Sequence, residues 1–165
     1  MSQPRHRIFV GKDNHKFSAA HMTVFPDGTK ERLHGHTYQV AVTLELRDVS
    51  FASFLDIGIL KQAIDAQCRD WNEILLLAEK CPHLRIVRRE AGELEFILSG
   101  KRYVVPADEA LLLPVANVVV ESLTEEFASA LLARLRPVLT NDIVATLEVV
   151  ITETRGQGGS YTVAL

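Results

Sequence analysis

The stretch LHGHTYQVAVTLEL at residues 33–46 decides the fold. From residue 36 onward its polar and apolar side chains alternate, which predicts a strand with one half-buried apolar face. His34 and His36 stand two positions apart at the start of this stretch. Because side chains two apart on a strand point to the same face, both imidazoles can reach one point. Gly35 between them leaves room for a close approach of backbone or substrate.

A third histidine, His21, lies on an expected preceding strand over residues 16–23. The loop FPDG at residues 25–28 has strong turn chemistry and allows an antiparallel return. Three neutral imidazoles around one ion leave a coordination position open, which is typical of catalytic rather than structural zinc. An HxH spacing also occurs by chance and commonly means two surface histidines. A Zn²⁺ site at His21, His34 and His36 is therefore one of two interpretations at this point.

Two helices are expected from apolar residues that recur at intervals of three and four. Asp56 precedes the first such pattern, which continues to Leu75 and predicts an amphipathic helix with an aspartate N-cap. The second pattern covers residues 117–135 and is stopped by Pro137.

The remaining segments predict strands and turns. A hairpin is expected over residues 84–105, with its turn at 99–101. Strands are expected over residues 143–152 and 160–165, separated by a flexible glycine-rich loop at 156–159. The order β-β-α-hairpin-α-β-β indicates an α+β protein with an antiparallel sheet.

Composition limits the class of protein. A chain of 165 residues with 47% hydrophobic residues predicts a single domain over 1–165 with a real core. With 18 basic and 21 acidic residues the net charge is -3, which argues against a nucleic-acid partner. No apolar run is long enough for a membrane span, and no secretory leader is visible. Cys68 and Cys81 make no disulfide framework, so a cytoplasmic protein is expected.

Several motifs together resemble the 6-pyruvoyltetrahydropterin synthase / 6-carboxytetrahydropterin synthase family. In chain order they are FSAAH at 17–21, LHGHTY at 33–38, DIGILK at 56–61, NVVVESL at 117–123, and ITET at 151–154 followed by Tyr161. The two histidine motifs are specific, and the later ones gain weight from their order. The resemblance covers most of the chain except about residues 79–112, where the hairpin at about 84–105 is read as an insertion.

The resemblance implies a tunnelling fold (T-fold), in which an antiparallel sheet with two helices on one face assembles into trimers and hexamers. It implies that His21, His34 and His36 hold Zn²⁺ and that active sites lie between subunits. It also implies that Glu153 anchors a small-molecule pterin. A carboxylate can accept two parallel hydrogen bonds from the 2-amino and ring N–H groups of that ligand. Without the resemblance, Glu153 is better interpreted as a solvated charge at a strand end.

The chain departs from the family pattern at the catalytic base. Family members usually carry a cysteine shortly before the HGH motif, whereas residues 28–34 here contain none. Glu31 is the nearest proton acceptor, and it is similar to a glutamate used by a subgroup associated with cleaving the dihydroneopterin side chain. Lys30 is a second candidate for the base. A plain solvated loop is a third interpretation of residues 30–32.

A second departure lies late in the first expected helix. The family has an Asp-His pair there, and the matching residues here are Asp70 and Trp71. Trp has no lone pair that can act as a base, so the proton relay is altered. Asp70 is either a catalytic residue beside Glu31 or an ordinary helix-surface acid. Trp71 either packs in the core or stacks on a flat ring.

These patterns predict a zinc-dependent lyase or synthase acting on a reduced neopterin derivative, in pterin, folate or queuosine-type biosynthesis. Glu31 and Asp70 would move protons while Glu153 holds the ring. The missing cysteine and histidine motivate an alternative, a zinc-containing protein that binds a pterin-like ligand without catalysis. A metal-free domain with incidental histidines is a third reading. The inserted hairpin either caps the substrate entrance or extends a contact in a homo-oligomer.

Overall fold

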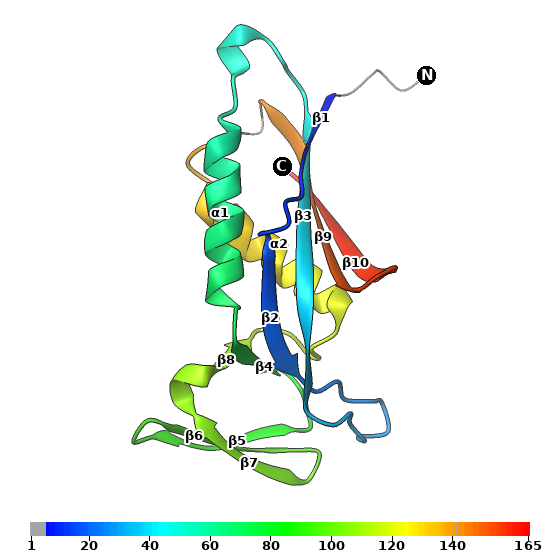
Figure 1. The fold of residues 1–165 in the computed structure, drawn as a ribbon, viewed down its shortest axis with the longest axis vertical. Coiled ribbons are helices and arrows are strands. Elements are labelled where there is room, and N and C mark those ends of the chain that lie inside the picture. The colour runs from blue at the N-terminus through cyan, green and yellow to red at the C-terminus, as the bar shows by residue number, and fades with distance from the viewer. Residues whose placement is uncertain (1–5, 141) are drawn as a thin grey trace.

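The computed structural model describes residues 6–140 and 142–165. In this part of the chain seven strands form one sheet, three form a second, smaller sheet, and two α-helices pack beside the first (Figure 1). The strands are β1 (His6–Val10), β2 (Lys16–His21), β3 (His34–Leu46), β4 (Ile74–Ala78), β5 (Leu84–Glu90), β6 (Glu93–Leu98), β7 (Lys101–Pro106), β8 (Ala110–Leu113), β9 (Val144–Thr154) and β10 (Gln157–Ala164). The helices are α1 (Ile57–Asp70) and α2 (Val120–Leu135), and short 3-10 turns lie at Phe51–Ser53 and Ala107–Glu109.

Strand β3 is the central member of the main sheet, whose order is β10-β9-β3-β2-β4-β8. Its alternating sequence forms the strand predicted from it: Val40, Val42 and Leu44 are fully buried, and the residues between them are less so. Strand β9 pairs along one edge of β3, while β1 and β2 pair with successive parts of the other edge. The strand is thereby paired on both sides toward its C-terminal end, whereas its first residues, including both histidines, pair with β2 alone.

Both helices contribute an apolar face to a single core. Asp56 caps α1 as predicted, since its carboxylate accepts a hydrogen bond from the backbone N–H of Gly58 at 2.7 Å. Helix α2 packs over β9 and β10, and α1 packs against α2 and β2. The residues that the helices bury are spaced by three and four, namely Leu60, Ile64, Gln67 and Cys68 of α1 and Leu123, Thr124, Phe127, Ala128, Leu131 and Leu135 of α2. Neither helix is long and apolar enough to cross a membrane.

The predicted helix to Leu75 is too long. Helix α1 ends at Asp70, and Glu73 has a left-handed backbone with φ of 58°, which turns the chain out of the helix. The apolar run that follows forms β4, which pairs parallel with β2 and with β8. The α+β class is confirmed, but the sheet is mixed rather than antiparallel throughout. A short apolar run does not reveal by periodicity whether it is helix or buried strand, which explains the error.

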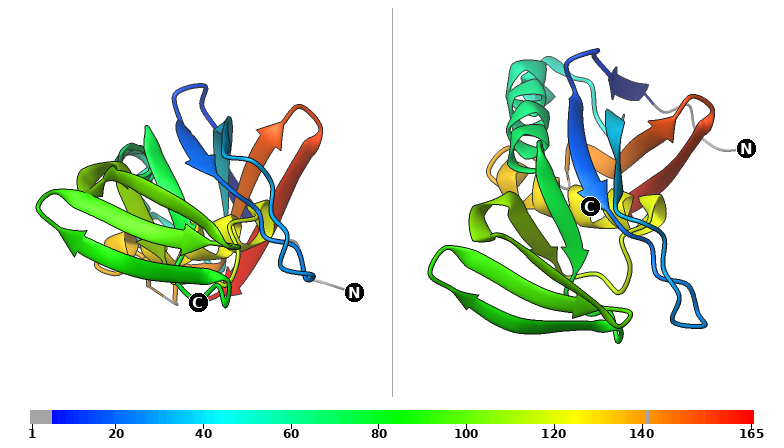
Figure 2. Two further views of the ribbon diagram at one scale, coloured as in Figure 1. Left: turned by 90° about the horizontal axis from the view of Figure 1, so that it is seen from below. Right: turned by 60° about the horizontal axis from the view of Figure 1, so that its bottom comes forward.

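Residues 84–105, expected to form a hairpin, make up almost all of a three-stranded antiparallel sheet, β5-β6-β7 (Figure 2). The turn between β6 and β7 lies at Ser99 and Gly100, both with positive φ, as a two-residue hairpin turn requires. Strand β6 buries Leu94 and Phe96, and Phe96 stacks on Tyr103 of β7 at 5.1 Å between ring centroids. This small sheet is therefore packed on the core on one face and is not a free flap.

The flexible loop expected at residues 156–159 is only a tight turn. Gly156 has φ of 84°, and β10 begins at the next residue. A Cβ on Gly158 would lie 2.4 Å from the carbonyl oxygen of Ile151, so only glycine permits the close approach of β10 to β9. Glycines that suggest a loop in the sequence serve here to bring two strands together.

His15 is completely buried beside α1. Its Nε2 lies 3.6 Å from an Asp65 carboxylate oxygen, and neither ring nitrogen has a hydrogen-bond partner. Burial lowers the pKa of His15, and this effect outweighs the opposing charge of Asp65; Lys12 and Lys61 lower the pKa further.

We predict that this histidine makes the fold sensitive to mild acid. Because folding lowers the pKa of His15 below its ordinary value of about 6.5, the unfolded chain binds this proton more readily than the folded chain, and the free energy of unfolding falls as pH drops below about 6.5. The loss is at most about 1.4 kcal/mol per pH unit. A His15→Gln variant should show a smaller difference in the free energy of unfolding between about pH 7.5 and about pH 5.5. Chemical denaturation at the two pH values measures this difference, and His6→Gln, at an exposed histidine, is the control. Equal differences in the His15 and His6 variants would contradict the prediction.

Candidate active site

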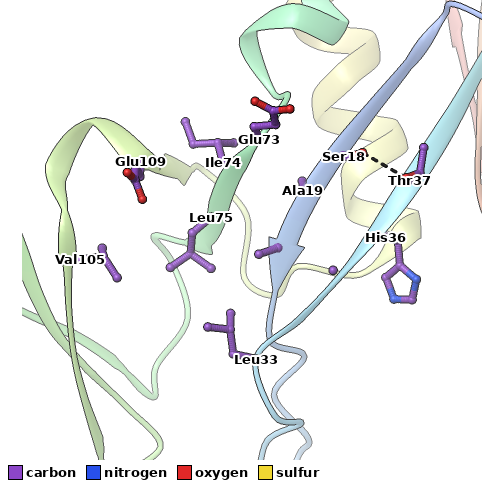
Figure 3. Close-up of a pocket in the computed structure, with 12 residues that line it drawn as sticks. Ser18, Ala19, Leu33, His36, Thr37, Glu73, Ile74, Leu75, Val105 and Glu109 are labelled. Atoms are coloured by element: carbon purple, nitrogen blue, oxygen red, sulfur yellow. Dashed lines mark hydrogen bonds between the residues drawn. The ribbon is translucent and has the colours of Figure 1, made fainter.

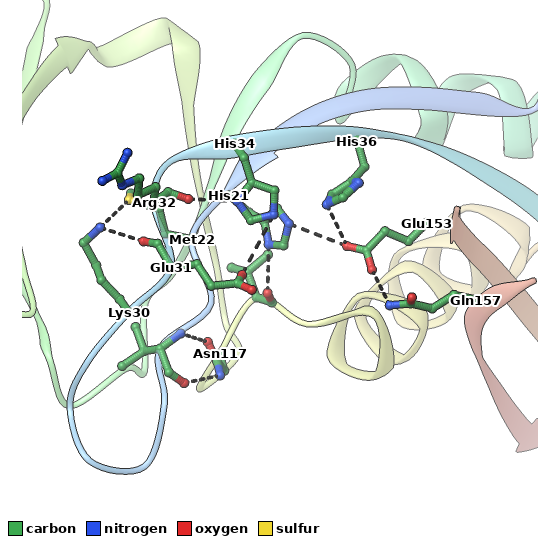
Figure 4. Close-up of polar contacts among 12 residues, drawn as sticks. His21, Met22, Lys30, Glu31, Arg32, His34, His36, Asn117, Glu153 and Gln157 are labelled. Carbon is green, nitrogen blue, oxygen red and sulfur yellow. Dashed lines mark hydrogen bonds and ion pairs between the residues drawn. The ribbon is translucent and has the colours of Figure 1, made fainter. Parts of the chain in front are cut away.

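Three imidazoles converge at one end of the main sheet. His21 of β2 is directly paired with His34 of β3, and His36 follows two residues later on the same face. One ring nitrogen from each histidine lies within 4.8 Å of the others. Figure 4 shows the three rings grouped below β3. The convergence predicted from the sequence is present.

Backbone carbonyls fix which nitrogen two of the three rings offer. Nδ1 of His21 lies 3.1 Å from the carbonyl oxygen of Val118, and Nδ1 of His34 lies 2.8 Å from that of Arg32. A carbonyl only accepts, so both rings donate from Nδ1 and present the lone pair of Nε2. Hydrogen bonds of this kind orient most metal-binding histidines.

One buried atom shows that the cluster fits a metal ion. Nε2 of His21 is buried and has no hydrogen-bond partner. A buried acceptor without a partner is costly, and a divalent cation would satisfy it. Burial lowers the pKa of His21 despite the hydrogen bond to Val118, and the neighbouring His34 lowers it further. The ring is therefore neutral near pH 7, which is the form that binds metal.

Glu153 of β9 lies beside this cluster. One of its carboxylate oxygens is 3.2 Å from Nε2 of His36 and 3.6 Å from Nε2 of His21. The hydroxyl of Tyr38 donates to the same oxygen at 3.4 Å, and the amide of Gln157 donates to the other at 3.2 Å. Burial and the charge of Glu153 raise the pKa of Tyr38, which keeps that hydroxyl a donor. Glu153 is thus a held, cavity-facing carboxylate and not a solvated strand end.

Glu31 reaches the cluster from the opposite side. Its carboxylate lies 3.9 Å from Nε2 of His34, and a hydrogen bond from Thr23 lowers the pKa of Glu31. Lys30 turns elsewhere: its ammonium donates to the backbone carbonyl of Glu31 at 2.9 Å and lies 3.4 Å from the sulfur of Met22. Of the two candidate bases at residues 30 and 31, the structure therefore places the side chain of Glu31, and not that of Lys30, beside the histidines.

The loop that carries Glu31 is hydrogen-bonded to the segment that precedes α2. Asn117 accepts a hydrogen bond from the N–H of Val24 at 3.0 Å and donates to its carbonyl at 2.8 Å (Figure 4). The backbone N–H of Glu31 also donates to the carbonyl of Thr23 at 2.9 Å. The loop is thus held in place and is not a solvated segment.

The three histidines and both glutamates line one polar cavity of about 330 Å³. A larger cavity of about 570 Å³ lies beside β2, β3 and β4, with Leu75 and Val105 in its wall (Figure 3). His36 borders both cavities, but its ring points away from the apolar wall of the larger one. The ligand nitrogens meet in the smaller cavity, and we therefore place the chemistry there.

A family model described as 6-pyruvoyl tetrahydropterin synthase matches residues 11–163. The chain belongs to this family. A protein of Methanocaldococcus jannaschii, provisionally named 6-carboxy-5,6,7,8-tetrahydropterin synthase, is 32% identical over 147 residues, which is 88% of each chain.

Solved structures share the fold of this synthase family member. The 6-pyruvoyl tetrahydropterin synthase of Plasmodium vivax superposes with a TM-score of 0.89 at 20% identity, covering 99% of this chain and 100% of the other. That of Plasmodium falciparum gives 0.89 at 19% identity, covering 98% and 99%. The expected tunnelling fold is confirmed.

Asp70 does not join the histidines within one chain. It lies at the end of α1, where its carboxylate pairs with Arg134 of α2. The residues that line the histidine cavity do not include it. Trp71 is 3% exposed and packs edge-on against Phe17 and Phe127, so it is a core residue and offers no face to a ligand.

Two residues that contact Glu153, Tyr38 and Gln157, were not expected from the sequence. Tyr38 lies two positions after His36, so the period-2 pattern that placed the histidines on one face could have included it. Gln157 gave no such signal, because it falls in a segment that was expected to be a loop.

We predict that the zinc-loaded chain holds about one zinc ion. His34→Ala should weaken zinc binding more than about 100-fold, because it removes one of the three expected ligands. Elemental analysis and a competition titration measure this. His6→Ala, an exposed histidine on β1, is the matched control and should leave the metal content unchanged. Retention of stoichiometric zinc by the His34 variant would contradict the site.

Proposed function

We propose that this family member is a zinc-dependent lyase or synthase acting on the side chain of a reduced neopterin derivative. The observation that carries the proposal is one cavity in which three convergent imidazoles are flanked by Glu31 on one side and Glu153 on the other. When bound, the metal would act as a Lewis acid on side-chain oxygens and make nearby protons easier to remove.

Glu153 would bind the pterin ring. Its two oxygens can accept from the 2-amino group and a ring N–H of the ligand. Tyr38 and Gln157 each donate to one of these oxygens. They would hold the carboxylate in one orientation, so that the side chain of the ligand extends toward the histidines.

Glu31 would be the general base. A hydrogen bond from Thr23 lowers its pKa, so it is ionised near pH 7 and can accept a proton. Its distance of 3.9 Å from Nε2 of His34 places it at the rim of the cluster. A solved variant of the Plasmodium vivax enzyme replaces by alanine a glutamate that is termed a catalytic residue, which supports a carboxylate in this role.

Two reactions use this arrangement. In carbon–carbon cleavage, Glu31 takes the proton of a side-chain hydroxyl, the adjacent carbon–carbon bond breaks, and its electron pair passes toward the ring. In carbon–oxygen cleavage, Glu31 takes a proton from carbon and a phosphate leaves from the neighbouring carbon. Asp70 stays a predicted second proton carrier. It would act only if another copy of the chain brought it to the cavity.

Assembly into trimers or hexamers fits the shape of the sheet. Strand β10 has one partner, β9, among the described residues, so its other edge is open along eight residues. Long open edges are usually covered. Pairing with a further copy would cover this edge and enclose the site between subunits, and light scattering at micromolar concentration measures the assembly.

We predict that Glu31→Gln lowers turnover by about 100-fold or more, as expected for loss of a general base. The zinc-loaded protein is incubated with dihydroneopterin and with its triphosphate, and products are separated by chromatography. Glu90→Gln, an exposed acid on β5, is the control. If the natural chain retains ligand but turns over neither compound, the non-catalytic binding protein is correct; equal turnover by the Glu31 variant would exclude its role as base.

A second prediction concerns Gln157. Gln157→Leu removes one hydrogen bond to the Glu153 carboxylate but no charge, and we expect KM to rise about tenfold with little change in kcat. Steady-state kinetics on the active substrate separates the two constants. A fall in kcat at constant KM would show that Gln157 acts on the reaction rather than on ring binding.

A further inference from the structure

Residues 22–33, between β2 and β3, carry the proposed base Glu31, and we call them the base loop. Val24 and Lys30 pair across it in an antiparallel bridge, so the base loop is a narrow hairpin. Asn117 holds the side of this hairpin that carries Val24. A two-stranded hairpin alone is marginally stable at best, so the position of Glu31 also depends on what holds the side of Lys30.

Lys30 connects the base loop with the small sheet β5-β6-β7. Its ammonium donates to the backbone carbonyl of Glu31 at 2.9 Å and lies 3.4 Å from the sulfur of Met22, as the dashed lines in Figure 4 mark. The same ammonium stands 5.2 Å from the centre of the Tyr103 ring. A cation at this distance is attracted by the electron-rich face of the ring. One side chain thus joins the backbone of the proposed base to an aromatic ring of another sheet.

The ring of Tyr103 is itself held by the small sheet. Tyr103 belongs to β7 and stacks on Phe96 of β6, with 5.1 Å between ring centroids and 13° between ring planes. Phe96 is fully buried. Through Phe96, the ring that contacts Lys30 is fixed to the core of the protein.

The base loop and the small sheet do not pack face to face. A cavity of about 480 Å³ lies between them. At the tip of the base loop, a Cβ on Gly28 would lie 3.0 Å from Cε1 of His83, so that ring packs directly on the tip. Of these two contacts across the cavity, the one through Lys30 lies next to Glu31 in the chain.

We propose that Lys30 and Tyr103 are positioning residues for Glu31. Through them the small sheet braces the base loop from the side opposite to Asn117. Because Lys30 holds the carbonyl of Glu31, it restricts the backbone that carries the carboxylate. A catalytic group displaced by about 1 Å can lose about 100-fold in rate, so such a brace matters for the reaction. The inference rests on the proposed function, in which Glu31 is the general base.

Neither positioning residue reaches the histidine cavity. The residues that line this cavity include Glu31 but neither Lys30 nor Tyr103. Their substitution should therefore change the rate of the proposed proton transfer and not the binding of the ligand. This separates them from Gln157, whose substitution is expected to raise KM.

The first experiment measures steady-state kinetics of the zinc-loaded chain, with dihydroneopterin and with its triphosphate, after equal zinc content has been verified in every variant. Lys30→Met keeps the length of the side chain but removes its charge and N–H donors, and should lower kcat about tenfold at nearly constant KM. Lys30→Arg keeps charge and donors and should restore kcat to within about threefold of the natural value. Lys16→Met, at an exposed lysine on β2, is the matched control and should leave both constants unchanged. A rise in KM at constant kcat in Lys30→Met would place Lys30 at the ligand and overturn the proposal.

Tyr103 tests the other end of the brace. Tyr103→Leu should lower kcat about fivefold, whereas Tyr103→Phe keeps the ring and should stay within about twofold of the natural value. Combined with Lys30→Met, Tyr103→Leu should lower kcat by no more than a further factor of about two, because both substitutions break the same chain of contacts. Losses that multiply to about fiftyfold would show that the two residues act independently and would overturn the proposal.

Amide hydrogen exchange shows whether the base loop has become looser. The N–H of Glu31 donates to the carbonyl of Thr23 at 2.9 Å, so its exchange rate reports opening of the loop. Lys30→Met and Tyr103→Leu should each raise this rate about fivefold, and Lys16→Met should leave it unchanged. A loss of kcat without faster exchange, or faster exchange without a loss of kcat, would overturn the proposal.

Lys30 as the base itself is the competing interpretation, and Lys30→Arg distinguishes it, because a guanidinium stays protonated and cannot accept a proton. If Lys30→Arg is as inactive as Lys30→Met while exchange at Glu31 stays slow, Lys30 is the base and the proposal is overturned.

Failure of the proposed function has a different signature. A natural chain that turns over neither compound contradicts that function, and hydrogen exchange then tests the brace by itself. Faster exchange at Glu31 in Lys30→Met and Tyr103→Leu supports the brace, and unchanged exchange overturns it.

Discussion

The register between β2 and β3 is the constraint on which the site depends. His21 is paired directly with His34, and His36 lies on the same face two residues later. A slip of one residue would turn both β3 histidines to the other face, because side chains alternate with a period of two. The alternating apolar run that buries Val40, Val42 and Leu44 prevents such a slip. The histidine cluster and the core therefore share one register.

Close backbone packing and hydrogen bonds then hold the histidines and the neighbouring loop in position. A Cβ on Gly35 would lie 2.9 Å from the carbonyl of Ala19, so glycine lets the two strands come close between the histidines. The segment before α2 supplies the carbonyl of Val118 to His21 and the side chain of Asn117 to the loop of Glu31. One short segment thus holds both His21 and the loop of the proposed base. This preorganisation is what a catalytic site requires.

The sequence predicted those parts that local patterns determine. Period-2 alternation found β3, an aspartate cap and spaced apolar residues found α1, and an HGH motif with an upstream histidine found the cluster. It failed where tertiary pairing overrides local preference: the apolar run of β4 became a parallel strand instead of a helical turn, and Gly158 became part of β10 instead of a loop. Contacts such as Gln157 with Glu153 depend on that pairing, so no local pattern indicates them.

The two departures from the family pattern have different structural consequences. Trp71 fills the core between Phe17 and Phe127, and a polar imidazole at that position would need a buried partner. Asp70 beside it is engaged by Arg134 across the helix pair. Within one chain, the carboxylates of Glu31 and Glu153 lie within 3.9 Å of histidine nitrogens of the cluster. In the proposed function, Glu31 on one side of the cluster would accept protons and Glu153 on the other side would bind the ring, although the cysteine and the histidine of the family pattern are absent.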